Sequence, residues 1–313
     1  MKAVYFIEKG KTAILDNPIP VCADDTVLLK TLYSGMTNGT ERNVLMGGNY
    51  GGTFPTKCAY QLVSEVVERG AEITGFNVGD IVYTGTFPGH VEYHLAKEND
   101  LMIKLPDGVD PQEAALLGVV CVPLHDARRA DVRIDDNVLV VGGGLIGQFA
   151  SQAAQVMGSK VTMADIDDRR LELAKTLGAD EVVNTSEPGG LERLHAGKPY
   201  SVVFESSGAN VLSDIVGTGW LNGLIGYRGR ILMIAGRFDV TYNFNAAQSN
   251  ELALMHISHF DQTDLEHAVR LLQKGRIKIR PLIKDIVSID DAVGIYDTLR
   301  DDPNALMGTV FKW

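Results

Sequence analysis

A glycine-rich turn directly after an apolar run constrains the fold of this chain more than any other feature. Gly142, Gly144 and Gly147 fit a G-x-G-x-x-G pattern that follows the apolar residues 137–141 and opens a stretch with helical spacing, 145–157. Glycines in this order allow a tight strand-to-helix turn, a close approach of backbone N–H groups to a pyrophosphate, and close packing of the helix on the strand. This context predicts the first strand–helix unit of a dinucleotide-binding domain; the alternative is a tight turn that binds nothing.

Strand and helix patterns alternate downstream of this turn. Helical patterns such as 171–177 separate short apolar runs that suit strands buried on both faces. These runs lie at 161–164, 181–183, 202–205, 230–235 and 252–258. Because alternating strands and helices form parallel βαβ units, the sequence predicts an α/β fold with a doubly wound parallel sheet.

The residues on either side of this region have other patterns. Up to about residue 109, short β-branched runs alternate with Gly, Asn, Asp and Pro, which is typical of a β-rich domain. These runs include 26–31, 62–67 and 80–83. A helix opened by Pro111 is predicted over 112–130. After residue 259 we expect a helix, a strand, a helix and a final strand, at 264–274, 280–287, 290–300 and 308–313.

Acidic residues follow the second strand of the predicted sheet. Asp165 lies 18 residues past the last glycine of the pattern, where a carboxylate of a dinucleotide-binding domain hydrogen-bonds the adenosine ribose. With Asp167 and Asp168 it would repel a ribose 2′-phosphate, so NAD(H) is the preferred cofactor. Arg169 and Arg170 could accommodate that phosphate, so NADP(H) stays an alternative.

Two more loops are expected beside the glycine turn, because the carboxyl ends of parallel strands share one edge of the sheet. One loop carries Ser206 and Gly208 and the other Ala235 and Gly236, with plain connecting turns as the alternative. The predicted cofactor-binding residues are therefore Gly142, Gly144, Leu145, Ile146, Gly147, Asp165, Arg170, Ser206, Gly208, Ala235 and Gly236.

Charge and cysteine content exclude several other classes of protein. The chain has 40 acidic and 29 basic residues, and the net charge of -11 argues against nucleic-acid binding. Three scattered cysteines encode neither a disulfide framework nor a Cys-rich zinc lobe. No apolar run reaches the roughly 18 residues of a membrane span, and charged residues near the start argue against a signal peptide. We therefore expect a cytoplasmic protein without membrane insertion.

Five short motifs occur in a fixed order along the chain. They are Val-Gly-Asp-Ile-Val at 78–82, a G-x-x-E-Y pattern at 89–93, Lys-Leu-Pro-Asp-Gly at 104–108, Glu-Ala-Ala-Leu-Leu at 113–117, and the glycine pattern. In this order they resemble the medium-chain dehydrogenase/reductase family, of the zinc-type alcohol dehydrogenase-like kind.

The resemblance implies a division of the chain and a type of chemistry. It implies a GroES-like substrate domain over 1–122, a Rossmann dinucleotide-binding domain over 123–260, and a return to the first domain over 261–313. It implies hydride transfer to or from C4 of a bound nicotinamide, with a small-molecule alcohol or ketone in the cleft between the domains. It also implies a homodimer formed through an edge strand of the cofactor sheet, either 252–258 or 230–235.

The metal sites of the family's zinc members are altered in this chain. A cysteine ligand is replaced by Thr37, a Gly-His-Glu motif by Ala59-Tyr60-Gln61, and a third ligand falls near Gly118 or Val119. Zinc takes Cys sulfur, His nitrogen or carboxylate oxygen, which Thr37, Tyr60 and Val119 do not supply. The family's four-cysteine lobe is also missing, because only the five residues 84–88 fill its place. We therefore expect no zinc.

His90 and His94 are four residues apart, a spacing that is also found between metal ligands. Four residues apart in a strand, they would lie on one face. Because they lack a cysteine or carboxylate partner, we interpret them as surface or cleft side chains.

Two segments refine the family resemblance. Residues 33–42 and 302–306 resemble the metal-free subgroup that includes 3-hydroxyethyl bacteriochlorophyllide dehydrogenase, which oxidises a secondary alcohol to a ketone. The resemblance implies a metal-free alcohol/ketone oxidoreductase. Two other functions stay open: a reductase of activated C=C bonds or quinones, and a non-catalytic dinucleotide-binding redox sensor.

Five side chains are candidates for acid–base chemistry without a metal. Hydride transfer to a carbonyl creates an alkoxide, which a hydrogen-bond donor or an acid must stabilise. Placed by the resemblance, the candidates are Thr37, Thr40, Glu41, Tyr60 and His256. The first three lie on the loop of the first lost zinc ligand, Tyr60 replaces the lost histidine, and His256 ends the strand expected beside the nicotinamide. The alternatives are structural: an aromatic wall for Tyr60, an ion pair between Glu41 and Arg42, and a hydrogen-bonded histidine at a domain junction.

Overall fold

Two units make up the chain in the computed structural model, which describes residues 1–313 throughout. One unit combines Met1–Gly118 with Asp261–Trp313, and the other is the inserted segment Val119–Phe260. The predicted helix 112–130 forms as α2 (Pro111–Ala114) and α3 (Leu117–Arg129), with Pro111 in the first turn of α2. None of the helices combines the length and the apolar character that a membrane crossing requires.

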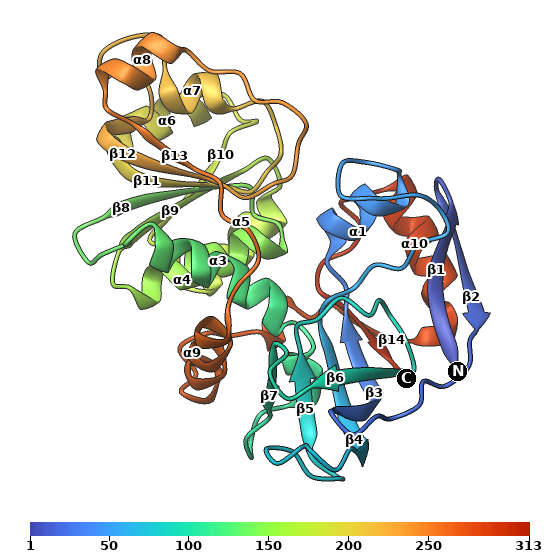
Figure 1. The fold of residues 1–313 in the computed structure, drawn as a ribbon. Coiled ribbons are helices and arrows are strands. Elements are labelled where there is room, and N and C mark those ends of the chain that lie inside the picture. The colour runs from blue at the N-terminus through green and yellow to red at the C-terminus, as the bar shows by residue number, and fades with distance from the viewer. The chain divides into compact units, whose positions relative to one another are not determined.

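Six parallel strands form the sheet of the inserted unit (Figure 1). They are β8 (Asn137–Val141), β9 (Lys160–Asp165), β10 (Glu181–Asn184), β11 (Tyr200–Glu205), β12 (Ile225–Met233) and β13 (Ala253–Met255). In space the order is β10-β9-β8-β11-β12-β13, so the chain proceeds outward from β8 in one direction and then outward from β11 in the other. This arrangement confirms the predicted α/β fold with a Rossmann-like, doubly wound parallel sheet.

Helices cover both faces of this sheet. α4 (Leu145–Val156) and α5 (Asp168–Thr176) lie on one face (Figure 1). α6 (Gly190–Gly197), α7 (Leu212–Val216) and α8 (Phe244–Ser249) lie on the other. A cluster of buried apolar side chains, among them Tyr200, Ile215 and Ile231, packs between the sheet and these three helices.

The edge strand β13 is shorter than predicted. The expected strand 252–258 forms only over Ala253–Met255, and His256 and Ser258 follow it as exposed residues outside the sheet. β12 lies inside the sheet, between β11 and β13, so the alternative edge strand 230–235 is wrong.

A hairpin and a seven-stranded sheet form the other unit. In the hairpin, β1 (Lys2–Glu8) pairs antiparallel with β2 (Lys11–Asp16). The larger sheet has the order β14-β15-β3-β4-β5-β7, with β6 also paired to β3. Its strands are β3 (Thr26–Gly35), β4 (Leu62–Arg69), β5 (Ile81–Thr84), β6 (Tyr93–Lys97), β7 (Met102–Lys104), β14 (Asp285–Ser288) and β15 (Thr309–Lys312). A separate β-rich unit is therefore confirmed.

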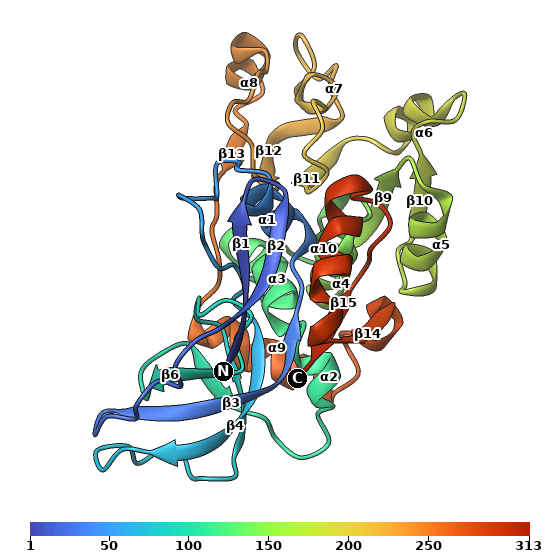
Figure 2. The same ribbon diagram turned by 90° about the vertical axis from the view of Figure 1, so that its right-hand side faces the viewer.

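Residues that follow the inserted segment complete this β-rich unit. They add α9 (Gln262–Gln273), α10 (Ala292–Asp301) and two short 3-10 helices, η1 (Arg280–Leu282) and η2 (Ile289–Asp291). The predicted strand 280–287 is wrong in its first half, because Pro281 lacks an N–H group and lies in η1. Figure 2 shows α10 and β15 in red beside α1 (Asn38–Leu45) and β3 in blue. Apolar side chains of α1, α10 and β15, including Leu45, Leu299 and Phe311, share one core.

Candidate functional site

The glycine turn connects β8 to α4 at the carboxyl edge of the parallel sheet. Gly142 has a φ of 97°, a left-handed conformation that favours glycine. A Cβ on Gly142 would lie 2.8 Å from Ser207 Cα, and a Cβ on Gly147 would overlap the carbonyl oxygen of Gly142. A Cβ on Gly144 would meet no atom within 4 Å. Two of the glycines are therefore required for packing, whereas Gly144 leaves open space in front of the turn.

The amino-terminal end of α4 faces this turn. Gly144 is its N-cap residue, and no side chain caps the helix there. The first N–H groups of an α-helix have no partner within the helix, and together with the helix dipole they favour a negatively charged group. The turn can therefore hold a pyrophosphate through backbone N–H groups.

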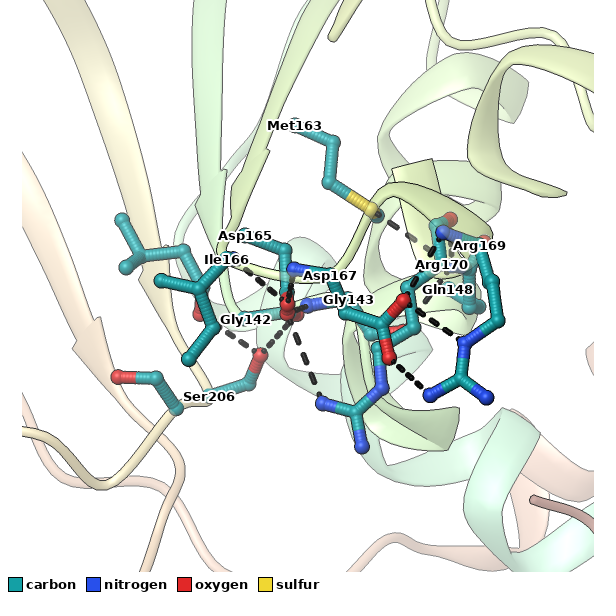
Figure 3. A network of polar contacts seen from close by, with 12 residues as sticks. Gly142, Gly143, Gln148, Met163, Asp165, Ile166, Asp167, Arg169, Arg170 and Ser206 are labelled. Atoms are coloured by element: carbon teal, nitrogen blue, oxygen red, sulfur yellow. Dashed lines mark hydrogen bonds and ion pairs between the residues drawn. The ribbon is translucent and has the colours of Figure 1, made fainter. Parts of the chain in front are cut away.

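Asp165 ends β9 beside the turn and is almost fully buried (Figure 3). Its Oδ2 accepts the N–H of Gly143 at 2.5 Å, and its Oδ1 accepts the N–H groups of Ile166 and Asp167 at 2.7 and 2.9 Å. The Arg170 guanidinium lies 3.7 Å from Oδ2. These contacts fix the carboxylate next to the glycine turn.

The second arginine of this segment is engaged in a different way. Arg169 pairs with the Asp167 carboxylate at 2.7 Å, and the hydrogen bond from Arg169 lowers the pKa of Asp167 to about 2. Asp167 also caps α5 by accepting the N–H of Arg169. Both arginines that could accommodate a ribose 2′-phosphate therefore contact carboxylates in this structure (Figure 3).

The loops after β11 and β12 lie at the same edge of the sheet. The Ser206 hydroxyl donates to the carbonyl oxygens of Val141 and Gly142, both at 3.0 Å. A Cβ on Gly208 would lie 3.6 Å from Ala235 Cβ, so the two loops are neighbours. The structure thus places the eleven predicted cofactor residues at the ends of β8, β9, β11 and β12 or in the first turns of the helices that follow.

Three of the predicted catalytic residues lie near one another in the β-rich unit. The Gln61 amide donates to Thr37 Oγ1 at 3.0 Å, and the Thr37 N–H donates to Glu41 Oε1 at 2.6 Å. Tyr60 precedes Gln61, is 6% exposed, and packs with its ring centroid 5.6 Å from that of Phe87. Sequence reasoning singled out Thr37, Glu41 and Tyr60 but missed Gln61, which connects them.

The remaining two predicted catalytic residues are placed differently. Thr40 is half-buried in the first turn of α1. His256 is exposed and belongs to the inserted unit. The structure brings neither of them into the hydrogen-bonded group around Thr37.

Glu41 is the centre of a buried polar network that the sequence did not predict. Its Oε2 accepts the Tyr296 hydroxyl at 2.5 Å and lies 3.2 Å from His90 Nε2. His90 Nδ1 lies 2.8 Å from Ser34 Oγ, which also accepts the Trp313 indole N–H at 2.9 Å. Burial and the Glu41 carboxylate raise the pKa of Tyr296 well above its ordinary value, so its phenol remains a hydrogen-bond donor.

This network corrects two interpretations of the sequence. Glu41 does not pair with Arg42, because Arg42 points to α10 and donates to the carbonyl oxygens of Leu299 and Arg300 at 3.1 and 3.3 Å. His90 is not a surface or cleft residue but is 1% exposed. No signal in the sequence could have linked His90 and Glu41 to Tyr296, because packing alone brings these distant positions together.

His94 is also buried, and it does not converge with His90 on a common partner. Its Nε2 lies 3.1 Å from Thr84 Oγ1 on β5. Burial, with a smaller effect of Lys57, lowers the pKa of His94 to about 3. The folded chain therefore keeps this imidazole neutral.

The buried His94 predicts a pH dependence of stability. An unfolded histidine takes up a proton near pH 6.5 and the folded one near pH 3, so acid favours the unfolded state. The free energy of unfolding is expected to fall below pH 6.5, by up to about 1.4 kcal/mol per pH unit from this residue. Urea denaturation at pH 7 and pH 5 measures the loss, and His94→Gln should reduce it. Equal losses in wild type and variant would contradict the assignment.

The comparisons with known proteins agree with this architecture. A family model for zinc-binding dehydrogenases matches residues 146–274. Sorbitol dehydrogenase 1 of Saccharomyces cerevisiae is 26% identical over 338 residues, which cover 94% of this chain and 93% of the relative. A short chain alcohol dehydrogenase of Escherichia coli CFT073, solved with NADH, matches with a TM-score of 0.87 at 20% identity and covers 100% of this chain and 99% of its own. A dehydrogenase of Sinorhizobium meliloti 1021, bound to NADP, gives 0.85 at 20% identity with the same coverage.

A Rossmann-like sheet with a glycine turn where its strand order reverses, inserted into a β-rich unit, defines the scaffold of a dinucleotide-binding dehydrogenase. The matching family model and the relatives support the zinc-type alcohol dehydrogenase-like branch of the medium-chain dehydrogenase/reductase family for this chain. The motifs and the glycine pattern therefore identified the family correctly from the sequence.

Proposed function

We propose that this protein is an NAD(H)-dependent oxidoreductase that interconverts a secondary alcohol and a ketone by hydride transfer. The observation that carries this proposal is the open glycine turn at the end of β8, with the Asp165 carboxylate fixed beside it. Similarity to a sorbitol dehydrogenase supports an alcohol as the substrate class. The nicotinamide, when bound, accepts or supplies the hydride at its C4.

The carboxylates around the end of β9 support NAD(H) over NADP(H). Asp165 lies at the position that meets the adenosine ribose, and Asp167 and Asp168 add negative charge next to it. Arg169 and Arg170 contact these carboxylates, so a 2′-phosphate would have to compete for them. The solved relatives do not discriminate, since one holds NADH and another NADP.

We further propose that the reaction proceeds without zinc, because the side chains at the family's ligand positions do not fit this metal. The Thr37 hydroxyl accepts a hydrogen bond from Gln61, and Tyr60 packs against Phe87. Zinc is bound by cysteine, histidine or carboxylate groups. The nearby Glu41 is already engaged with the Thr37 N–H, His90 and Tyr296, which removes it as a free ligand.

Among the candidate hydrogen-bond donors to the substrate, Thr37 has a hydroxyl that is oriented by a hydrogen bond from a neighbouring side chain. Because Gln61 donates to Thr37 Oγ1, the hydroxyl hydrogen of Thr37 is left to donate to another oxygen. We assign this hydrogen bond to the substrate oxygen, with the Tyr60 phenol as a second donor. Glu41 accepts the Thr37 N–H and is a positioning residue. Thr40 and His256 are further candidates for carrying the proton to or from solvent.

The function is tested by following NADH absorbance with a panel of secondary alcohols, ketones and enones, and by measuring metal content. We expect alcohol–ketone turnover without stoichiometric zinc, insensitive to EDTA, and a lower Kd for NADH than for NADPH. Consumption of enones without oxidation of alcohols would instead indicate the C=C reductase. Tight NADH binding without turnover of any carbonyl would indicate the redox sensor.

The two proposed donors give a sharper prediction. Thr37→Val and Tyr60→Phe are each expected to lower kcat by about 100-fold, because a positioned proton donor contributes about this much or more. Both variants should bind NADH as wild type does, as measured by fluorescence titration. Tyr227→Phe, which removes an exposed phenol in the inserted unit, is the matched control and should keep full activity. Wild-type kcat in both donor variants would refute the assignment.

A further inference from the structure

Glu205, the last residue of β11, joins two loops at the carboxyl edge of the parallel sheet. Its side chain is fully buried. Its Oε1 accepts the N–H groups of Ser207 and Gly208 at 3.0 and 3.2 Å and the Ser207 hydroxyl at 2.5 Å. Its main-chain carbonyl oxygen accepts the N–H groups of Ile234 and Ala235 at 3.0 and 3.3 Å. One residue therefore fixes the start of the loop after β11 and of the loop after β12.

Arg237 completes this connection from the loop after β12. Its guanidinium forms an ion pair with Glu205 Oε2, and its Nε and Nη1 donate to the carbonyl oxygens of Ala235 and Ala209 at 3.2 and 3.3 Å. The Arg237 side chain is 16% exposed, so both charges are largely removed from water. A buried carboxylate is destabilising unless it is paired. The planar guanidinium meets this need and reaches three partners at once, which a lysine ammonium does not reproduce.

The two loops lie on one side of the point where the strand order reverses. In sheets of this topology the two halves of a dinucleotide lie on opposite sides of that point. The glycine turn and Asp165 lie on the side of β8 and β9. The loops that Glu205 and Arg237 join lie on the side of β11 and β12.

We propose that the Glu205–Arg237 pair positions these two loops to hold the nicotinamide ring of the cofactor, and so sets affinity for that ring alone. Both are positioning residues, because their charged groups contact each other and the loop backbone. This inference rests on the proposed function, since it requires a nicotinamide dinucleotide at this edge of the sheet.

The test compares the binding of NADH with that of ADP-ribose, which lacks the nicotinamide, to the full-length protein by isothermal titration calorimetry. Arg237→Lys keeps the positive charge but loses the planar fork. It is expected to raise the Kd for NADH by about tenfold or more and the Kd for ADP-ribose by less than about twofold, because small displacements of positioning groups weaken binding strongly. Glu205→Gln should show the same selective pattern as Arg237→Lys: a higher Kd for NADH and a nearly unchanged Kd for ADP-ribose.

Arg230 offers a matched control in the same unit. It is paired with Asp136, its Nη1 donates to the carbonyl oxygens of Ala130 and Asp131 at 2.6 and 2.8 Å, and its side chain is 23% exposed. Asp136 directly precedes β8, so this pair lies toward the opposite edge of the sheet. Arg230→Lys is expected to leave both dissociation constants unchanged.

A rise in Kd that is selective for NADH in both variants, and absent in Arg230→Lys, supports the proposal. Equal rises for the two ligands, or no rise, overturn it. If Arg237→Lys does not fold, the double variant Glu205→Gln with Arg237→Met, which removes both charges, is measured against the same expectation. Failure of the wild type to bind either ligand would refute the proposed function, and the inference with it.

Discussion

Replacing Gly147 with alanine is expected to lower the free energy of unfolding of the inserted unit by about 3 kcal/mol or more and to abolish NADH binding. The new Cβ would overlap the Gly142 carbonyl oxygen and lie 3.0 Å from Ser206 Oγ. Because the overlap is with backbone, α4 would have to move away from β8. Urea denaturation followed by Trp220 fluorescence measures the free energy of unfolding of the inserted unit. A Trp313→Phe background removes the signal of the only other tryptophan.

Two other glycines provide controls for this substitution. Gly144→Ala meets no atom within 4 Å, so its unfolding midpoint should be unchanged, but its methyl group would lie where a pyrophosphate approaches and should raise the Kd for NADH about tenfold. Gly294 lies in α10, is exposed and is equally open, so alanine there should stabilise the chain by about 0.5–1 kcal/mol. A wild-type midpoint for Gly147→Ala would contradict the close packing of α4 on the turn.

Replacing Glu41 with leucine is expected to destabilise the β-rich unit by about 3–5 kcal/mol, because each buried polar group that loses its hydrogen-bond partner costs about 1–3 kcal/mol. The substitution leaves the Tyr296 hydroxyl, the Thr37 N–H and His90 buried without their acceptor. Each such group loses its interaction with water on folding and gains nothing in return. Trp313 fluorescence in a Trp220→Phe background reports this unit, because Trp313 donates to Ser34 in the same network.

Two further variants test whether the loss of stability in Glu41→Leu comes from the broken network or simply from the removal of a negative charge. Tyr296→Phe removes one donor and should cost about 1–2 kcal/mol. Asp25→Asn removes an exposed carboxylate that pairs with Lys97 in the same unit, and its midpoint should stay at the wild-type value. If Glu41→Leu unfolded at the same urea concentration as Asp25→Asn, the network would not stabilise the unit.

Most of the parallel sheet could be predicted from the sequence, because each of its central strands is a short apolar run with a glycine or an acidic residue at its end. The strands β8, β9 and β11 and the helices α4 and α5 lie where the patterns predict them. α7 was not predicted, because five residues between Val211 and Gly217 are too few to show helical periodicity. β13 was predicted too long, because apolar residues continue past the point where the chain leaves the sheet.

The buried polar contacts could not be predicted in the same way. Glu41 and His90 are polar residues, and the apolar periodicity that marks a core does not apply to them. Tyr296, which donates to Glu41, lies 255 residues further along the chain, and Trp313, which joins the network through Ser34, lies 279 residues beyond that serine. Glu205 ends one predicted strand and Arg237 follows another, but only the pairing of β11 with β12 in the structure shows that their side chains meet.

The position of β15 has a consequence for the synthesis of this protein. β15 pairs with β3 through Val310–Gly35 and Lys312–Tyr33, and the ribosome adds it only after the whole segment Val119–Phe260. The parallel sheet has all of its strands within that segment and can therefore close while the nascent chain is still growing. The β-rich unit has to wait for its last strands, so the part of the protein that is made first is the last that can finish folding.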